Sequence, residues 1–251
     1  MRRKVLSDVE LRSRHAEDEK LVVEQGTIIT PAAMDYIRQH GIELETGEKK
    51  KQETMTVAKI PVKEGKFTYV DYETGEELDH KPEEMTHLFG NKLVSKTHPR
   101  IAFRGALDSL MAEVMWTQTI AIEEHYSAVC ADLEEVLMLL RKVMSAEVRD
   151  VKLEKLVLLG MDSARMRQIT HHMRDELKMD HPVPSYKFGK MCTALNRLRT
   201  CVRAAELAAA RAFYEGKKCT RVDIVETMNR LSSCIYIMYC KVIGKIYQVD
   251  K

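Results

Sequence analysis

The stretch FGKMCTALNRLRTCVRAAELAAARAFY, residues 188–214, decides the fold class. Its apolar side chains recur three or four positions apart, which is the spacing of one face of an α-helix. The residues that would point inward are Met191, Leu195, Leu198, Val202 and Ala205. We therefore predict a helix from about Phe188 to Tyr214 with one buried face.

The same periodicity predicts further helices on both sides of this stretch. Apolar residues at helical spacing indicate helices around 103–114 and 129–143, and Asp162 would cap a shorter one. Thr220 would cap a last helix that reaches about Tyr247, with Asp223 placed as in a capping box. Five amphipathic helices with short connections predict a mainly α fold, a five-helix bundle. From Pro99 onward we expect no strands.

Upstream of the bundle we predict a small N-terminal α/β segment. Residues 20–29 would form a strand or hairpin arm, and 45–55 would be a hydrophilic linker. Between them, Thr30 and Pro31 would cap and begin a helix that runs to about Arg38.

A short β-hairpin is predicted at residues 66–78, around a turn at Thr74–Gly75. We therefore divide the chain into three parts. These are a small region with an accessory or docking role (1–60), the hairpin with a phosphate-binding loop (61–97), and the helical bundle (98–251).

Charge, cysteine usage and hydropathy limit the class of protein. The net charge is only +2 from 40 basic and 38 acidic residues, which gives no electrostatic case for nucleic acid or an anionic membrane. The six cysteines form no C-x-x-C pair and fall mostly in helical patterns, which indicates reduced thiols. No signal peptide is apparent, and Lys241 and Lys245 interrupt the most apolar tail. We expect a soluble cytoplasmic protein.

The helix at 188–214 carries a polar set within its pattern. Arg199, Arg203 and Glu206 are spaced i, i+4, i+7, so they share one helix face. Arginine forks suit phosphate oxygens, and a carboxylate could orient an arginine, bind a ribose hydroxyl or hold Mg²⁺. The alternative is a solvated face with an ordinary ion pair.

A second candidate is the basic segment 89–104, which contains no acid. A glycine-containing loop with Lys92 and Lys96 would lead into the helix that begins after Pro99. Loop amides, lysines and a helix N-terminus together favour bound phosphate. Asp108, further along this helix, could be a buried ion-pair partner or an exposed acid.

A third set lies in the last helix. Asn229, Ser232 and Ser233 are mediocre helix formers within an apolar pattern, and buried polar groups require partners. They either face a ligand or tie helices together.

A structural zinc site is not predicted. His171 and His172 are neighbours on a helix and point about 100° apart, so they cannot grip one ion as an i, i+4 pair can. His80, His87 and His98 cluster in sequence without a nearby cysteine or a regular ligand spacing.

Three of these segments resemble a known family. MTHLFGNKLVSKTHPRIAFRGALDS (85–109), LNRLRTCVRAAE (195–206) and MNRLSSCIYIM (228–238) resemble the ethanolamine-utilisation type of ATP:corrinoid adenosyltransferase. That type is similar to the propanediol-utilisation adenosyltransferases. The resemblance covers roughly 84–240, and residues 26–44 resemble the family's amino-terminal segment. It implies a transferase that moves the 5′-deoxyadenosyl group of ATP to Co(I) of cobalamin, giving adenosylcobalamin and triphosphate.

The resemblance also implies roles for individual residues. Arg199, Arg203 and Glu206 match the R-x-x-x-R-x-x-E set that lines the family's ATP site, and Asn229 and Arg230 would bind ATP from the last helix. The triphosphate would contact the basic segment through Lys92, Lys96, Arg100 and Arg104.

The family's A-L-D-S aspartate corresponds to Asp108, which would meet Arg199 of a neighbouring subunit. The resemblance thus implies a homo-oligomer, a dimer or a trimer, with ATP at the subunit interface. Mg²⁺ would bridge the triphosphate oxygens.

The segment DHPVPSYKFG, 180–189, stands where relatives place the residues below the corrin. Its candidates for corrinoid binding are His181, Val183, Tyr186 and Phe188, with core packing as the alternative for Phe188. They would surround a four-coordinate cobalt with apolar or aromatic groups.

Two departures from the family pattern stand out. Some members carry a histidine and a C-C-x-x-C cluster before the K-P and T-H-L residues, whereas this chain has VDYETGEELDH there. We therefore expect no structural Zn²⁺ or Fe²⁺. His98 occupies a position that is often Asp in relatives.

The resemblance implies a physiological setting as well. Ethanolamine ammonia-lyase or its reactivase would be the partner, in the cytoplasm or within a bacterial microcompartment. Two alternatives stay open: a helical enzyme that acts on another nucleotide, and a non-enzymatic scaffold of an ethanolamine-utilisation compartment.

Overall fold

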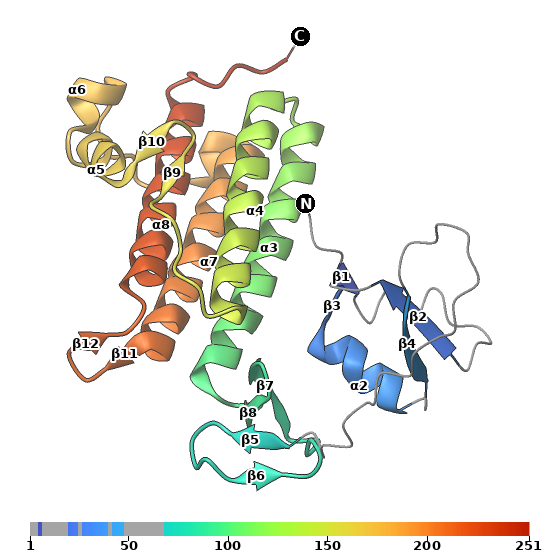
Figure 1. Ribbon diagram of the computed structural model, residues 1–251. Coiled ribbons are helices and arrows are strands. Elements are labelled where there is room, and N and C mark those ends of the chain that lie inside the picture. Colours follow the sequence, from blue (N-terminus) through green and yellow to red (C-terminus); the bar gives the residue numbers. More distant parts are fainter. Residues whose placement is uncertain (1–4, 7–19, 25–26, 40–41, 48–67, 251) are drawn as a thin grey trace. The chain divides into compact units, whose positions relative to one another are not determined.

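The computed structural model describes residues 5–6, 20–24, 27–39, 42–47 and 68–250 (Figure 1). The chain separates into two compact units, Met1–Leu93 and Val94–Lys251, with the boundary inside strand β8 (Lys92–Ser95). The roles that we assign to the three sequence regions stay predictions.

The C-terminal unit is built on long helices that lie side by side (Figure 1). These are α3 (Pro99–Glu123), α4 (Ser127–Val148), α7 (Gly189–Phe213) and α8 (Val222–Ile243). The shorter α5 (Ser163–His171) contacts α8, and α6 (Met173–Leu177) follows it. A 3-10 turn, η1 (Tyr186–Phe188), precedes α7. The predicted helical bundle is confirmed.

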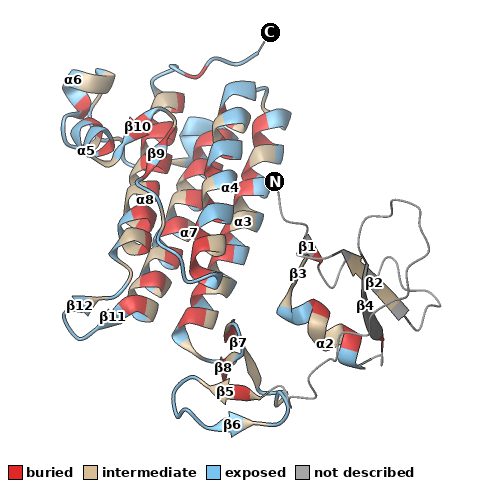
Figure 2. Ribbon diagram, in the orientation of Figure 1, coloured by how far each residue is buried: buried red, intermediate tan, exposed pale blue. Residues whose placement is uncertain are grey.

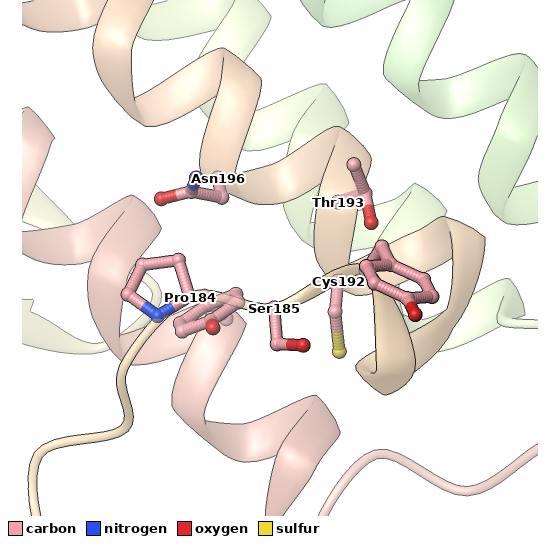
Figure 3. Close-up of a pocket in the computed structure, with 7 residues that line it drawn as sticks. Pro184, Ser185, Cys192, Thr193 and Asn196 are labelled. Carbon is pink, nitrogen blue, oxygen red and sulfur yellow. The ribbon is translucent and has the colours of Figure 1, made fainter.

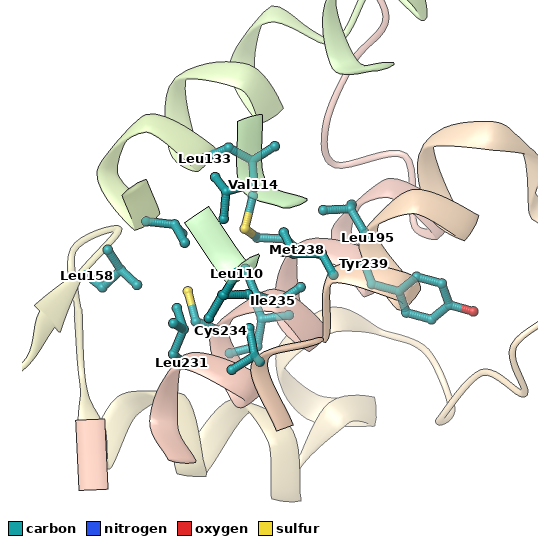
Figure 4. Packing of buried hydrophobic residues seen from close by; sticks show 14 of the residues in the cluster. Leu110, Val114, Leu133, Leu158, Leu195, Leu231, Cys234, Ile235, Met238 and Tyr239 are labelled. Atoms are coloured by element: carbon teal, nitrogen blue, oxygen red, sulfur yellow. The ribbon is translucent and has the colours of Figure 1, made fainter. Parts of the chain in front are cut away.

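One apolar core holds these helices together. The face of each helix that turns toward its neighbours is buried, whereas the opposite face is exposed (Figure 2). Leu110, Leu133, Leu195, Leu231 and Ile235 are each at most 1% exposed and meet inside the bundle (Figure 4). Burial of one such side chain contributes about 1.5–3 kcal/mol, so this interior stabilises the bundle.

Side chains cap the starts of α3 and α5, whereas α4, α6, α7 and α8 begin without a side-chain capping hydrogen bond. Asp162 caps α5 as predicted, because its Oδ1 accepts a hydrogen bond of 2.7 Å from the Arg165 amide. The prediction that Thr220 caps the last helix is wrong: α8 begins at Val222 after Arg221. The Thr220 hydroxyl instead donates a hydrogen bond of 3.1 Å to the Phe213 carbonyl, at the end of α7. This bond closes the connection between α7 and α8.

The expectation that strands stop at Pro99 is also wrong. Two short antiparallel pairs interrupt the helices: β9 (Val157–Leu158) with β10 (Met161–Asp162), and β11 (Tyr214–Glu215) with β12 (Lys218–Cys219). Gly160 and Gly216 lie at φ +70° and +61° in the turns, which glycine adopts without strain. Two-residue strands are too short to give an alternating pattern in the sequence.

The N-terminal unit contains a four-stranded sheet. Its strands β5 (Tyr69–Asp71), β6 (Glu77–Leu78), β7 (Met85–Phe89) and β8 lie in the order β6-β5-β8-β7. The predicted hairpin around Thr74–Gly75 is confirmed by the antiparallel β5–β6 pair. The expectation that Lys92 lies in a loop is wrong, because Lys92 is the first residue of strand β8. Strands β7 and β8 form a second hairpin, whose turn contains Gly90 at φ +57°.

The remaining described part of this unit is a small α/β arrangement. Helix α2 (Pro31–Gln39) is capped by Thr30 as predicted, since the Ala33 amide donates to Thr30 Oγ1 at 3.2 Å. Strand β2 (Lys20–Glu24) pairs in parallel with β4 (Glu43–Gly47), and β1 (Val5–Leu6) pairs in parallel with β3 (Ile28–Ile29).

Two predictions for this region need correction. Residues 20–24 form a strand, which confirms that alternative, but 20–24 and 28–29 belong to separate parallel pairs, so the hairpin-arm alternative is wrong. The predicted linker at 45–55 begins with three residues of β4, because they pair with β2, and its remainder lies outside the described residues.

Candidate functional site

Helices α7 and α8 carry five of the predicted site residues. The two helices contact each other along their length and are joined by the β11–β12 hairpin (Figure 1). Arg199, Arg203 and Glu206 lie on α7, and Asn229 and Arg230 lie on α8. Because they are spaced i, i+4, i+7 on α7, Arg199, Arg203 and Glu206 form a polar row along one face of this helix.

Glu206, Asn229 and Arg230 form a continuous polar chain. The Asn229 side-chain amide donates to Glu206 Oε1 at 2.5 Å, and the Arg230 guanidinium donates to Asn229 Oδ1. These three residues line a pocket of about 390 Å³. The other lining residues are Arg167, Tyr214, Cys219, Val222, Val225 and Glu226. Because it offers guanidinium groups, carboxylates and an amide, this pocket suits a ligand with both phosphate and hydroxyl groups.

The two predicted arginines of α7 are not among the lining residues of this pocket. Arg199 is half-buried, and its Nε and Nη2 donate to Asn196 Oδ1 at 3.3 and 3.1 Å. Arg203 is exposed. The structure thus brings Glu206, Asn229 and Arg230 together, and the ATP-binding roles of Arg199 and Arg203 stay predictions.

The predicted phosphate ligands of the basic segment are two lysines near the surface and two arginines that contact a buried carboxylate. The Lys92 ammonium lies 5.4 Å from the ring centroids of both Tyr72 and Phe89, within the N-terminal unit. Lys96 follows the end of β8 and is exposed. Both residues are amines near the surface, which is compatible with contact to an anionic ligand.

Arg100 and Arg104 are instead engaged by a buried carboxylate. Arg100 Nε donates to Glu147 Oε1 at 2.6 Å, its Nη2 donates to the Glu147 carbonyl at 3.0 Å, and Arg104 Nε donates to Oε2. Glu147 is 0% exposed. The first turns of α3 are therefore fixed to the end of α4 by charged hydrogen bonds, and direct ATP contact by these arginines stays a prediction.

Glu147 was missed by sequence reasoning, although a signal was available. It lies four and seven residues after Val143 and Leu140, so it continues the buried face of α4. A carboxylate on an apolar helix face requires a partner, and two arginines on the preceding helix provide it.

The predicted corrinoid segment is exposed, as a binding surface must be. Val183 and Tyr186 are 82% and 81% exposed, and Phe188 is 40% exposed, which argues against core packing for Phe188. His181 Nδ1 lies 2.8 Å from the Tyr236 hydroxyl, and the two rings stack with an interplanar angle of 13°. The segment is thereby anchored on α8. Its role in corrinoid binding stays a prediction.

A second pocket, of about 170 Å³, adjoins this segment. Pro184, Ser185 and Tyr186 line one side, and residues of α7 and α8 line the other (Figure 3). The helical lining residues are Cys192, Thr193, Asn196 and Tyr239. Burial raises the pKa of the Cys192 thiol to about 11, so this thiol is protonated at neutral pH. Sequence reasoning treated this part of the helices as core and missed the pocket.

The described residues contain neither a cluster of metal ligands nor a helix suited to span a membrane. Within the described part of the chain, no three His, Cys, Asp or Glu side chains gather as a metal site would require. All six cysteines are free thiols. Among the helices of residues 5–250 that the structure describes, none combines the length and the apolar character that crossing a bilayer demands.

The α7–α8 pair thus carries a charged pocket of about 390 Å³ and an uncharged pocket of about 170 Å³, and both are candidate sites for small polar ligands in a helical bundle. Residues 78–242 match the family model for cobalamin adenosyltransferase, more than half of the sequence, and the chain belongs to this family.

Individual relatives agree with this family. The chain is 34% identical over 166 residues to the corrinoid adenosyltransferase EutT of Salmonella typhimurium, covering 66% of this chain and 61% of that protein. The EutT protein of Escherichia coli K12 is 35% identical over 159 residues, covering 63% and 58% of the two chains. The Salmonella corrinoid adenosyltransferase PduO is 24% identical over 156 residues, covering 61% of this chain and 45% of that protein. The chain therefore spans about 60% of the length of the two EutT relatives.

Proposed function

We propose that this chain is an ATP:corrinoid adenosyltransferase. In the reaction, the electron pair of Co(I) forms a bond to the 5′-carbon of ATP, the bond between that carbon and its oxygen breaks, and triphosphate leaves. The products are adenosylcobalamin and triphosphate. The corrinoid is a substrate that performs the bond-forming step, so the protein supplies binding, orientation and electrostatics.

The observation that carries this proposal is the Glu206–Asn229–Arg230 chain in the 390 Å³ pocket. It assembles residues that match the nucleotide-binding motifs of the family from two different helices. Because Asn229 is already held by Glu206, its orientation is fixed before a ligand arrives. A prepared site of this kind lowers the cost of orienting a substrate.

We assign the triphosphate to Arg199, Arg203 and Lys96, which all belong to the C-terminal unit. Guanidinium and ammonium groups neutralise the charge that builds on the leaving group, which stabilises the transition state. Arg100 and Arg104 hold Glu147, so we assign them the positioning of the first turns of α3. Mg²⁺ would bind mainly triphosphate oxygens, with Glu206 or Glu226 as the carboxylates that the pocket offers.

The corrinoid is assigned to the segment with His181, Val183, Tyr186 and Phe188. Exposed apolar and aromatic side chains can cover a face of the corrin and exclude water from the cobalt, which favours reduction of the metal. The bond between His181 and Tyr236 holds this segment against α8, on the same pair of helices as the nucleotide pocket.

A homo-oligomer completes the proposal. Asp108 is exposed on α3, so it is accessible to a second copy of the chain, and the pair with Arg199 of a neighbouring subunit is the contact that we propose. The product would serve ethanolamine ammonia-lyase or its reactivase, in the cytoplasm or in a bacterial microcompartment. The support for this setting is the similarity to the EutT proteins.

The direct test mixes the purified chain with ATP, Mg²⁺ and chemically reduced cob(I)alamin under anoxic conditions. We expect an absorbance change as a light-sensitive cobalt–carbon bond forms, and prior treatment of the bare protein with a chelator should not reduce the rate. Binding of ATP without any photolabile product would favour an enzyme that acts on another nucleotide. Binding of neither substrate would favour a scaffold.

Replacement of Arg203 separates ligand binding from folding. Arg203 is exposed, so Arg203→Ala should change the free energy of unfolding by less than about 0.5 kcal/mol. Loss of a charged hydrogen bond to phosphate should lower kcat/KM for ATP by about 10- to 100-fold. Arg211→Ala, which removes another exposed arginine of α7, is the matched control and should leave kcat/KM unchanged. Equal losses in both variants would contradict the assignment.

A further inference from the structure

Tyr239 has an unusual hydroxyl for a buried residue. The residue is 2% exposed, and its hydroxyl has no hydrogen-bond partner among the described residues. Its ring extends from the edge of the core cluster, away from Leu110 and Leu133 (Figure 4). A buried hydroxyl without a partner is destabilising, so a protein that keeps one usually has a use for it.

This residue lines the 170 Å³ pocket beside the segment that we assign to the corrinoid. Pro184 and Ser185 contribute to the lining from that segment (Figure 3). Tyr186, which is 81% exposed, lines the pocket as well. A molecule that covers residues 181–188 would therefore lie next to the pocket and could place a side group inside it.

The pocket selects for uncharged polar groups. Each of its seven lining residues is uncharged, and Ser185, Thr193 and Asn196 add hydroxyl and amide groups to the wall. Burial, with the nearby Cys192 and Cys240, raises the pKa of the Tyr239 phenol and outweighs the opposing charge of Arg199, so the hydroxyl stays protonated and can donate at neutral pH. The cation beside the pocket, Arg199, is engaged by Asn196 Oδ1, and no lining residue carries a charge that would pair with a carboxylate or phosphate.

We propose that this pocket binds a primary carboxamide on the periphery of the corrinoid, with the Tyr239 hydroxyl as a hydrogen-bonding group that determines specificity. An amide offers both a carbonyl acceptor and N–H donors, which matches an unpartnered phenol among hydroxyl and amide neighbours. This inference rests on the proposed function, because it names the chemical group of the corrinoid substrate that the chain recognises.

Tyr239→Phe tests the hydroxyl alone, since the ring and the packing are kept. Loss of the hydroxyl should raise the corrinoid Kd by about five- to tenfold, measured by calorimetric titration with hydroxocobalamin. The KM for the corrinoid should rise by a similar factor. The KM for ATP should stay unchanged. The melting temperature of the ligand-free protein should stay equal or rise by about 2 °C, because the variant no longer buries an unpartnered polar group.

Tyr247→Phe is the matched control. The Tyr247 hydroxyl donates to Asp132, so its removal should lower the melting temperature and leave the corrinoid Kd unchanged. The two tyrosines thus predict opposite patterns. A structural role for the Tyr239 hydroxyl would instead make Tyr239→Phe behave like Tyr247→Phe, and this result would overturn the proposal.

A comparison of ligands identifies the group that enters the pocket. The wild-type chain should bind cobinamide, which keeps the peripheral amides, more tightly than cobyrinic acid, which carries carboxylates instead, and Tyr239→Phe should narrow this difference by about fivefold. An unchanged ratio would overturn the inference. A raised KM for ATP with an unchanged corrinoid Kd would assign the pocket to adenine and also overturn it. If the wild-type chain neither binds nor adenosylates a corrinoid, the proposed function itself fails.

Discussion

Glu147 illustrates how single residues fix the start of a helix in this bundle. Its fully buried carboxylate accepts hydrogen bonds from Arg100 and Arg104, which come from successive turns of α3. Removing a charge from water is costly, and good geometry with several donors offsets that cost only while every partner is present. The group is therefore sensitive to the loss of any one member.

Glu147→Gln should be strongly destabilising. The change removes the negative charge that both guanidinium groups contact, while the 3.5 Å ion pair between Arg100 and Asp150 remains. We therefore expect a loss of about 3 kcal/mol in the free energy of unfolding. Urea denaturation followed by circular dichroism measures this loss. The control is Glu134→Gln, which removes a surface ion pair with Arg141 and should cost less than about 0.5 kcal/mol. Similar midpoints for both variants would show that the buried network contributes little.

The residue-scale features differ in how far the sequence reveals them. The polar row of α7 follows from helical spacing, and Glu206 and Asn229 do lie in one pocket. Tyr239 could not be distinguished from core, because a tyrosine at an apolar position is compatible with either burial or ligand contact. Whether its hydroxyl has a partner depends on segments that are distant in sequence.

At the scale of elements, long helices were easier to predict than their connections. The sequence periodicity locates α7 within one residue at each end, since burial of one face requires it. The predicted start of α8 at Thr220 was wrong because the preceding residues, Lys218 and Cys219, form strand β12. The Thr220 hydroxyl donates to the Phe213 carbonyl and therefore does not cap α8. Two-residue strands depend on glycine turns, and their pairing carries no periodic signal.

Asp223 connects the start of α8 to the segment after α4. Its Oδ2 accepts a hydrogen bond of 2.7 Å from the Leu153 amide, and Arg221 donates to both carboxylate oxygens at 3.0 and 2.9 Å. Burial opposes ionisation of this carboxyl, but the bonds from Arg221 and Leu153 outweigh it and hold the pKa of Asp223 below its ordinary value. The ionised form is thus stabilised in the folded chain.

This lowered pKa predicts the direction of a pH effect. Because the folded-state pKa lies below the unfolded value, the contribution to stability is fully present above about pH 5 and is lost as the pH falls through the folded-state pKa. Asp223→Asn should lower the free energy of unfolding by about 1–3 kcal/mol at pH 7. Below the folded-state pKa the two proteins should converge.

Urea denaturation at a series of pH values tests the Asp223 prediction. Asp175→Asn, which changes an exposed acid of α6, should follow the wild-type curve within about 0.5 kcal/mol. A difference between Asp223→Asn and the wild type that stays constant from pH 7 to pH 3 would show that the charge of Asp223 does not stabilise the fold.

At the scale of the whole molecule, the position of the site raises the question of assembly. Arg203 and Asp108 are exposed, and the other predicted nucleotide residues of α7 and α8 are half-buried: Arg199, Glu206, Asn229 and Arg230. A single chain therefore leaves these residues partly open to solvent. A neighbouring subunit would exclude water from the reacting atoms, which strengthens the electrostatic stabilisation of a leaving triphosphate.

The proposed pair between Asp108 and Arg199 of a neighbour predicts a charge-swap result. Asp108→Arg should lower the mass measured by light scattering, because two arginines would then face each other across the interface. Adding Arg199→Asp should restore the mass while activity stays low, since the assigned phosphate ligand is gone. Glu154→Arg, an exposed acid outside the helices, should leave the mass unchanged. An unchanged mass in Asp108→Arg, or no recovery in the double variant, would show that this pair does not hold the subunits together.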